Sequence, residues 1–555
     1  MNKRRRDEDG PLDPIAMEVF SNRLLSITED MGNTLIRSSF STNIKERRDC
    51  SVALFDGKGR LVAQASHVPL HLGSLMGSVS AVLDAVDIEE MRDGDAFICN
   101  DPYLAGGTHL PDVSIVTPVF WDGEVRFFCA NIAHHSDFGG AVPGSIAGGL
   151  RSIFEEGLRI PVIRLVHAGK MDDALLNLIA HNTRDPNERT LDLKVQVATN
   201  ERGASSLLEM FRQLGASVVE QSIEDILAYT SRRLRNRVKE MNDGFATGEA
   251  QIDDDGLGGD PVTIKATVRI SGDRLTVDFN GSDPEARGAM NVAESAARAT
   301  VYYAVKVLLD PNLLPNSGMF DAIDVKLPDG SIINPRFPAA VGARSITCNK
   351  IARAIFMAFV DLLPPEKALA SGFDAVPAIV FSGDWPDRPG SFVYLETMAG
   401  GAGAGATHDG MDAVQVHMTN TSNLPAEALE NEYPLMVVEY ALVPNSGGAG
   451  EFRGGLGLAR EIKVLQDDIV FSVRSDGHKA GAPGVFGGQP GGTARLIQNR
   501  GMTNEQELSS KVARLQLIAG ETIRLQTPGG GGYGDPRRRP AEHTEADIRQ
   551  AKVAH

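Results

Sequence analysis

Histidine and aspartate side chains gather in two short segments of this sequence, at a spacing typical of metal ligands. The first segment reads His-Leu-Pro-Asp and the second His-His-Ser-Asp, which together supply His109, Asp112, His134, His135 and Asp137. Two imidazoles and one carboxylate can hold a divalent ion and leave coordination positions open for water or a substrate. These residues therefore indicate a catalytic metal site. The alternative is that they cap turns and satisfy buried polar groups.

The metal site requires the two segments to meet, and the residues between them predict a hairpin that brings them together. Residues 114–120 and 125–132 are rich in β-branched and aromatic side chains, and the Trp-Asp-Gly-Glu sequence between them is typical of a turn. If these strands pair antiparallel, both segments lie at the same edge of a sheet. Asp101, which follows a short apolar strand at 96–99, is then a further ligand or a partner of one.

A charged cluster, Glu-Arg-Arg-Asp at 46–49, precedes a second predicted hairpin formed by residues 51–55 and 60–65. Charge at the beginning of a buried strand is costly unless it is paired. The cluster is therefore either a solvated turn or part of the active site. The second interpretation is favoured, because the hairpin returns the chain toward His67 and His71.

The remaining pattern predicts a mixed α/β (α+β) fold with largely antiparallel sheets and helical segments. Apolar residues recur at helical spacing in 15–38 and across 191–241, with a break near Gly215, whereas apolar and polar residues alternate in 262–270 and 274–279. Further helices are expected at 296–308 and 351–363. We expect an N-terminal α/β unit with the metal site, a helical segment, an α+β unit and a glycine-rich, β-rich unit, with boundaries at 1–190, 191–245, 246–395 and 396–555.

Glycine accounts for 58 of the 555 residues and is densest in the last third of the chain. Segments 398–407, 445–457 and 529–534 contain glycines in close succession. Such glycines allow backbone amides to line an anion, or two backbones to pack closely. No Lys-Ser or Lys-Thr follows 398–407, so the pattern is not that of a nucleotide phosphate loop. We expect short strands here, in a solenoid-like or sandwich arrangement.

The composition disfavours some classes of partner. With 55 basic and 73 acidic residues the net charge is −18, which disfavours binding to nucleic acid. The basic clusters at 3–6 and 537–539 are expected to be solvated tails. Four widely spaced cysteines without a Cys-x-x-Cys pair suit a reducing cytoplasm. No run of 18 apolar residues indicates a membrane span.

Several long motifs are spread in order over nearly the whole chain. They include NIKERRDCSVALFD at 43–56, NDPYLAGGTHLPD at 100–112, NIAHHSDFGG at 131–140, HMTNT at 417–421, SGGAGEFRGGLG at 446–457 and TPGGGGYGDP at 527–536. Together they resemble the hydantoinase B/oxoprolinase family, the B-type subunits of ATP-dependent cyclic-amide hydrolases and of the related ketone carboxylases. The motifs do not specify a substrate, because they occur alike in family members that act on hydantoins, 5-oxoproline, lactams and ketones.

The resemblance implies separate roles for the candidate residues. The metal position of the family falls on His109, Asp112 and His134, and zinc or manganese is the expected ion. The expected catalytic residues, which would act as general base or orient a ligand, are Asp49, Asp101 and His135, with Asp137 supporting the ligands.

The resemblance also implies a division of labour between two chains. ATP would be handled by a separate A-type subunit in a hetero-oligomer, expected to be A2B2, which fits the absence of a Walker pattern from this sequence. The partner would phosphorylate the amide oxygen of a small cyclic amide, and this chain would complete the metal-assisted hydrolysis. A ketone carboxylase subunit and a non-catalytic scaffold subunit are the alternatives. We expect a cytoplasmic protein that binds neither a membrane nor nucleic acid.

Overall fold

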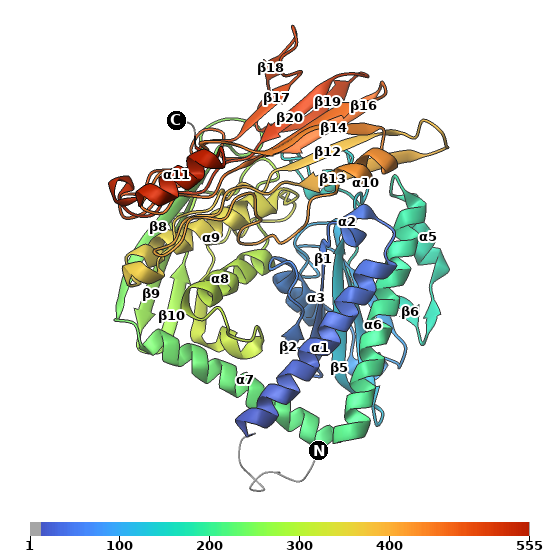
Figure 1. The fold of residues 1–555 in the computed structure, drawn as a ribbon. Coiled ribbons are helices and arrows are strands. Elements are labelled where there is room, and N and C mark those ends of the chain that lie inside the picture. Colours follow the sequence, from blue (N-terminus) through green and yellow to red (C-terminus); the bar gives the residue numbers. More distant parts are fainter. Residues whose placement is uncertain (1–12, 554–555) are drawn as a thin grey trace.

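The computed structural model describes residues 13–553, and its N-terminal part is built on a seven-stranded antiparallel sheet (Figure 1). The strand order is β2-β1-β5-β4-β3-β6-β7. The strands are β1 (Cys50–Asp56), β2 (Leu61–Gln64), β3 (Ala96–Cys99), β4 (Asp112–Trp121), β5 (Glu124–His134), β6 (Ile163–His167) and β7 (Lys170–Met171). The predicted hairpin of β4 and β5 is confirmed. Its turn residues Asp122 and Gly123 both have positive φ (53° and 80°), as an Asp-Gly turn between twisted strands requires.

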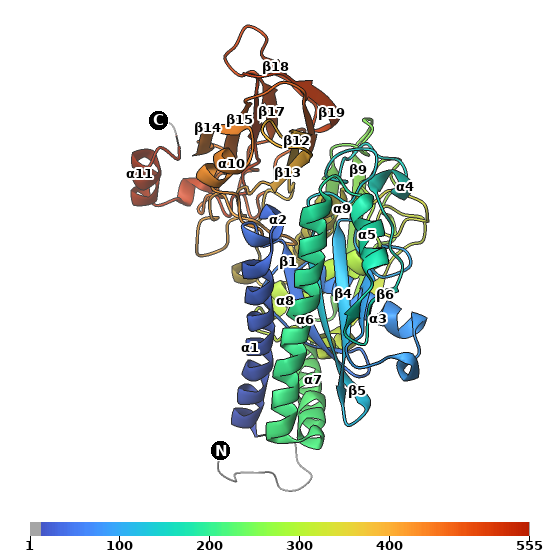
Figure 2. The ribbon, with the colours of Figure 1, turned by 90° about the vertical axis from the view of Figure 1, so that its right-hand side faces the viewer.

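Helices cover both faces of this sheet. Helices α1 (Pro14–Ser38) and α6 (Pro186–Leu214) lie side by side on one face, and α3 (His71–Ala85) packs on the other (Figure 2). Side chains alternate between the faces of a strand, so that Val52 of β1 joins the core beneath α1 while Ala53 joins the core beneath α3. The central strands are therefore buried on both sides.

The predicted helical segment consists of α6 and α7 (Ala216–Lys239), and the predicted break lies at Gly215. Gly215 has a φ of 84°, which glycine adopts without the steric cost of a Cβ atom. The shorter helices of the first half are α2 (Thr42–Lys45), η1 (Ile88–Glu90), α4 (Ile153–Glu156) and α5 (Asp173–His181).

A second sheet has the order β11-β10-β9-β8, and α8 (Glu294–Leu309) and α9 (Arg344–Val360) lie in its core. Its strands are β8 (Gly244–Ile252), β9 (Val262–Ser271), β10 (Arg274–Asp278) and β11 (Ile323–Lys326), with η2 (Ser317–Ala322) before the last. Helix α9 begins at Arg344, earlier than the predicted 351–363. The polar first turns of α9 are buried against other segments, which the local apolar pattern does not reveal.

The C-terminal third is a sandwich of two antiparallel sheets that share one hydrophobic core. One sheet contains β12 (Ala378–Asp384), β13 (Ser391–Thr397), β16 (Ile469–Arg474) and β19 (Lys511–Leu517). The other contains β14 (Leu435–Leu442), β15 (Leu458–Val464), β17 (Arg495–Gln498), β18 (Gln506–Glu507) and β20 (Thr522–Gln526). Of the two expected arrangements the sandwich is therefore the correct one. The mixed, largely antiparallel α/β fold class is confirmed.

The glycine-rich segments lie against one another and pack backbone against backbone. A Cβ atom on Gly530 would lie 1.9 Å from the carbonyl oxygen of Ala402, and one on Gly454 would lie 1.9 Å from that of Gly530. Among the two roles considered for these glycines, the structure supports close packing. The remaining helices are η3 (Pro365–Lys367), α10 (Ala426–Glu432), η4 (Pro536–Arg538) and α11 (Ala541–Arg549).

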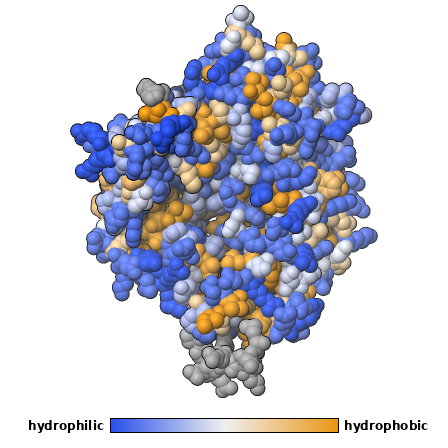
Figure 3. Space-filling model, in the orientation of Figure 1, coloured by the Kyte–Doolittle hydropathy of each residue, from blue (hydrophilic) through white to orange (hydrophobic). Residues whose placement is uncertain are grey.

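The surface facing the viewer in Figure 3 is mostly hydrophilic, with hydrophobic side chains in separate small groups. Within residues 13–553, no helix combines the length and the apolar character needed to cross a lipid bilayer. The basic cluster expected at 3–6 lies outside the described residues. In the other cluster Arg537 is exposed, but Arg539 is paired with Asp409 and Asp547 at 2.7 Å each, so 537–539 is not a solvated tail throughout.

Candidate metal centre

The first sheet brings the two histidine-bearing segments together at one end of its strands. Asp112 begins β4, His134 ends β5, and the two residues are direct partners in the antiparallel register. His109 lies in the turn before β4, where its carbonyl oxygen accepts a hydrogen bond from the amide of Asp112 at 3.2 Å. The predicted convergence of the two segments is therefore confirmed.

His109, Asp112 and His134 form a compact buried group. One potential ligand atom from each residue lies within 4.8 Å of the others, and the two imidazole rings are 4.9 Å apart. His109 Nε2 is 3.3 Å from Asp112 Oδ2. Two ligands that are each about 2.1 Å from a shared ion lie about 3.0 to 3.4 Å apart in octahedral or tetrahedral geometry. The spacing of this pair thus matches that of two ligands of one ion.

The hydrogen bonding of the group also fits a metal ion. Both ring nitrogens of His109 and Oδ1 of Asp112 are buried without a hydrogen-bond partner among the described residues. Buried polar atoms are rarely left unsatisfied in folded proteins. Oδ2 of Asp112 accepts hydrogen bonds from Thr108 Oγ1 (2.6 Å) and Arg344 Nη2 (2.5 Å), which fix the carboxylate in place. An ion held by one ring nitrogen of His109 and by the Asp112 carboxylate would satisfy part of this unused bonding capacity.

The protonation states of the group suit metal binding. Burial, followed by the nearby charge of Arg344, lowers the pKa of His109 to about 4, and burial also holds the pKa of His134 well below its usual value. Burial alone would raise the pKa of Asp112, but the attraction of His109 and Arg344 outweighs it and holds that pKa well below the usual range. At neutral pH the group therefore offers uncharged imidazoles and an ionised carboxylate, the forms that bind a metal.

Asp49 lies in the same site, as the active-site interpretation of the 46–49 cluster predicts. It directly precedes β1, and its carbonyl oxygen accepts a hydrogen bond from the amide of His134 at 2.9 Å. His71 joins it to the metal group, because His71 Nε2 is 3.6 Å from both Asp49 Oδ1 and Asp112 Oδ1. Burial raises the pKa of Asp49.

The structure does not bring Asp101, His135 or Asp137 into this group. The Asp101 carboxylate pairs with Arg159 at 2.7 Å and accepts hydrogen bonds from two backbone amides of its own turn. The expectation that it adjoins the metal ligands is corrected, because its oxygens are occupied by the turn and by Arg159.

His135 and Asp137 likewise have other partners. Side chains of neighbouring β residues point to opposite faces, and the ring nitrogens of His135 lie 3.0 Å from Gln196 Oε1 and 2.8 Å from Arg189 Nη1. Asp137 accepts hydrogen bonds from the amides of Gly139 and Gly144 and pairs with Arg184 at 2.6 Å. It therefore anchors the glycine-rich loop after β5 and does not support the metal ligands.

Two arginines from distant parts of the chain were not predicted to belong to the site. Arg344 begins α9 and contacts Asp112, and Arg474 ends β16 and donates a hydrogen bond to Ser345 Oγ at 2.6 Å. Arg47, from the predicted cluster, is fully buried and binds the carbonyl oxygen of Leu395 in β13. A charged residue at the beginning of a helix or the end of a strand carries no local signal that it will be buried.

Glu156, at the end of α4, is a further buried carboxyl group near Arg344. One of its oxygens accepts hydrogen bonds from the amides of Val341 (2.7 Å) and Gly342 (2.6 Å), while the other has no hydrogen-bond partner within residues 13–553. Burial raises its pKa to about 8, although the two amides oppose the shift.

We expect Glu156→Gln to flatten the dependence of stability on pH. An unfolded Glu156 loses its proton near pH 4.5, whereas the folded form keeps it up to about pH 8. Between these values the free energy of unfolding falls by about 1.4 kcal/mol for each pH unit of increase, and the loss is complete above pH 8. Thermal unfolding midpoints of both proteins from pH 5 to 8.5 test this. Parallel curves would show that Glu156 is not protonated in the folded chain.

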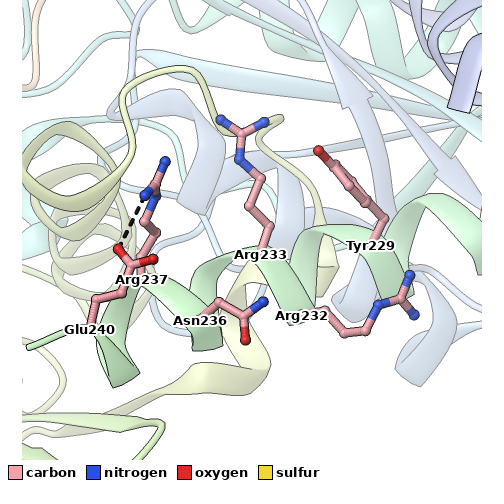
Figure 4. A pocket seen from close by; sticks show the side chains of 6 residues that line it. All are labelled: Tyr229, Arg232, Arg233, Asn236, Arg237 and Glu240. Atoms are coloured by element: carbon pink, nitrogen blue, oxygen red, sulfur yellow. Dashed lines mark hydrogen bonds and ion pairs between the residues drawn. The ribbon is translucent and has the colours of Figure 1, made fainter.

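Several pockets lie outside the metal group, and two of them have charged or polar linings of interest. One, of about 700 Å³, is lined by α3, α8 and the loop at 102–106, which continues into His109. The other, of about 320 Å³, lies on α7 and is lined by Tyr229, Arg232, Arg233, Asn236, Arg237 and Glu240 (Figure 4). Arg233 and Arg237 of the second pocket are paired with Asp310 at 2.6 and 3.6 Å, so part of its positive charge is neutralised.

Comparison with known proteins places this arrangement in a family. The model of the hydantoinase B/oxoprolinase family matches residues 13–536. A protein from Pseudomonas sp. that is named as the B-type subunit of a D-/L-hydantoinase is 32% identical over 97% of this chain and 92% of its own length. 5-oxoprolinase 1 from Arabidopsis thaliana is 33% identical over 94% of this chain, which spans only 42% of that longer protein.

Solved structures show the same fold. The ATP-dependent caprolactamase from Pseudomonas jessenii superposes with a TM-score of 0.90 at 29% identity, covering 98% of this chain and 95% of the other. An acetone carboxylase in its nucleotide-free form has a TM-score of 0.89 at 18% identity, covering 98% and 78%, and this likeness concerns the fold alone. Given the family match over almost the whole length, the chain belongs to the hydantoinase B/oxoprolinase family.

Proposed function

We propose that this chain is the B-type component of an ATP-dependent cyclic-amide hydrolase. The observation that carries the proposal is the buried group of His109, Asp112 and His134, whose ligand atoms converge and are partly without hydrogen bonds. A site with three protein ligands leaves positions for water or a substrate, whereas a structural site is usually closed by four. The hydantoinase component and the caprolactamase among the similar proteins support this reaction class.

We propose further that the ATP-dependent step is performed by a separate A-type subunit. The similar hydantoinase chain is named as one component of a larger enzyme, and the 5-oxoprolinase contains more than twice the length that this chain matches. The sequence itself contains no Walker pattern for ATP phosphates. An unstrained amide is a poor electrophile, so phosphorylation of its oxygen by the partner would make the ring carbon reactive.

The reaction at this site would then use two molecules of water. The first adds to the ring carbon of the O-phosphorylated amide. The C–N bond breaks, its electron pair goes to nitrogen, and nitrogen takes up a proton. The acyl phosphate that results is hydrolysed by the second water to a carboxylate and inorganic phosphate. A divalent ion, zinc or manganese by its ligand set, would make bound water more acidic.

The residues of this chain would each have a defined task in that reaction. His109, Asp112 and His134 would hold the ion, while Thr108 and Arg344 keep Asp112 in place. Asp49 is the best-placed general base, because burial raises its pKa and His71 links it to Asp112. His71 would orient the Asp49 carboxylate, and its own ring is held by Ser51 Oγ, which lies 3.0 Å from Nδ1.

The proposal is tested by mixing the full chain with its A-type partner, ATP and a panel of hydantoin, 5-oxoproline, lactams and ketones. We expect ADP, phosphate and a ring-opened product from one cyclic amide, with no requirement for bicarbonate. Absence of product from every cyclic amide in the panel would refute the hydrolase.

The second candidate is a component of a ketone carboxylase. The fold alone does not separate the two activities, since the acetone carboxylase shares it. The assay described above distinguishes them. Turnover of a ketone only in the presence of bicarbonate would identify the chain as a carboxylase component. A chain that raises partner activity equally with and without its metal would be the scaffold component.

A further inference from the structure

Arg474 is buried beside the candidate metal centre without a carboxylate partner. Its side chain is almost fully enclosed, and within residues 13–553 it donates a single hydrogen bond, to Ser345 Oγ at 2.6 Å. Nε of Arg474 is buried with no hydrogen-bond partner. A guanidinium group carries five N–H donors and remains charged, so this arrangement leaves most of its donors unused.

The charged neighbours of Arg474 balance one another and leave no counter-charge for Arg474 itself. Arg47 and Arg344 are also buried, and the site contains two carboxylates, Asp49 and Asp112. Three positive charges therefore face two negative ones. Burial, together with repulsion by Arg344, lowers the pKa of Arg474 to about 9. A buried charge without a counter-ion is costly, and an anionic ligand would supply the missing charge.

The other two arginines have partners within the protein. Arg344 binds Asp112, and Arg47 binds Asn43 Oδ1 at 2.8 Å, Thr397 Oγ1 at 2.9 Å and a backbone carbonyl of β13. Among the three arginines of the described site, Arg474 makes no direct ion pair with a carboxylate. Its guanidinium group is therefore available to bind a ligand.

We propose that Arg474, supported by Arg344, forms an anion subsite that holds the phosphoryl group of the activated substrate beside His109, Asp112 and His134. The proposal rests on the function proposed above and deepens it. The planar N–H fork of arginine matches two oxygens of a phosphoryl group, and such charge-assisted bonds are strong in a site that excludes water. Because phosphate leaves only in the second hydrolytic step, the subsite would hold the group throughout ring opening. Arg474 would thus be a positioning residue for the reacting carbon.

The first test is binding of inorganic phosphate to the full chain, measured by calorimetry after removal of metal ions with a chelator. We expect Arg474→Gln to weaken phosphate binding at least tenfold. Arg538→Gln, which removes the same charge from an exposed position, should leave binding unchanged. Equal binding by the Arg474→Gln variant and the unaltered chain would overturn the proposal.

Two further variants keep the test decisive if Arg474→Gln does not fold. Arg474→Lys retains the charge but loses the fork and should bind phosphate more weakly than the unaltered chain. Ser345→Ala retains the arginine but removes its hydrogen-bond partner, and should weaken binding by a smaller factor. If both bind phosphate as the unaltered chain does, the subsite is not formed by Arg474.

Measurements with the A-type partner distinguish this proposal from the proposed function. Arg474→Gln should retain its metal content and leave ATP consumption by the partner in place, while ring-opened product falls at least tenfold. If the unaltered complex opens no cyclic amide but phosphate binding still depends on Arg474, the proposed reaction fails and the subsite stands. If the complex is active but Arg474→Gln does not change phosphate binding, the proposed subsite is refuted and the proposed function is not.

Discussion

His109→Ala should abolish metal binding and reduce turnover on the order of 10³-fold or more, while the chain remains folded. The His109 ring is fully buried and makes no hydrogen bond with the described residues, so its removal costs the protein only the 3.3 Å approach to Asp112 Oδ2. It would remove one of the three side chains proposed to hold the ion. Metal content by mass spectrometry and product formation with the A-type partner are the measurements.

His543→Ala is the matched control, because His543 is an exposed histidine of α11. It should change neither metal content nor turnover. If His109→Ala retains its metal, the ion is not held at this group. If the variant loses both metal and fold, as judged by circular dichroism, the ion is structural and the scaffold function gains support.

Gly530→Ala should destabilise the C-terminal third by about 3 kcal/mol or more, or prevent soluble expression. The added Cβ atom would lie 1.9 Å from the carbonyl oxygen of Ala402 and 2.4 Å from its carbonyl carbon. Both are backbone atoms, so no side-chain rotation relieves the overlap. The thermal unfolding midpoint and the yield of soluble protein measure the effect.

The control for this substitution is Gly244→Ala, at the beginning of β8. A Cβ atom there meets nothing within 4 Å, and the backbone is not in the left-handed region. Its unfolding midpoint should stay within a few degrees of that of the unaltered chain. Equal midpoints for the two variants would mean that the glycine-rich segments can separate without loss of stability.

Local patterns were sufficient to predict much of the fold. The hairpin of β4 and β5 follows from two runs of β-branched residues around Asp-Gly, and the break between α6 and α7 follows from Gly215. Alternating polarity likewise predicted β9 and β10. The hairpin in turn explains why His109, Asp112 and His134 could be grouped from sequence, since their convergence needs only one strand pairing. The division into four units at 190, 245 and 395 stays a prediction.

The parts of the site that sequence reasoning missed depend on contacts between distant segments. Arg344 of α9 and Arg474 of β16 lie at or near Asp112. Local periodicity in the sequence cannot predict a contact between segments so far apart in the chain. His134 and His135 are neighbours with equal chemistry, and only their opposite orientation separates them. Asp101 lies in a turn whose residue types are typical of metal ligands, but its carboxylate forms an ion pair with Arg159.

The sandwich also affects when the site is completed during synthesis. The metal-binding side chains belong to β4, β5 and the turn before them, whereas Arg474 ends β16 and the carbonyl that binds Arg47 belongs to β13. Chains are made from the N-terminus and fold as segments emerge from the ribosome. A nascent chain therefore contains its candidate ion-binding residues long before Arg474 and β13 have been made. The proposed hydrolytic chemistry would therefore begin only after the final third has emerged and docked.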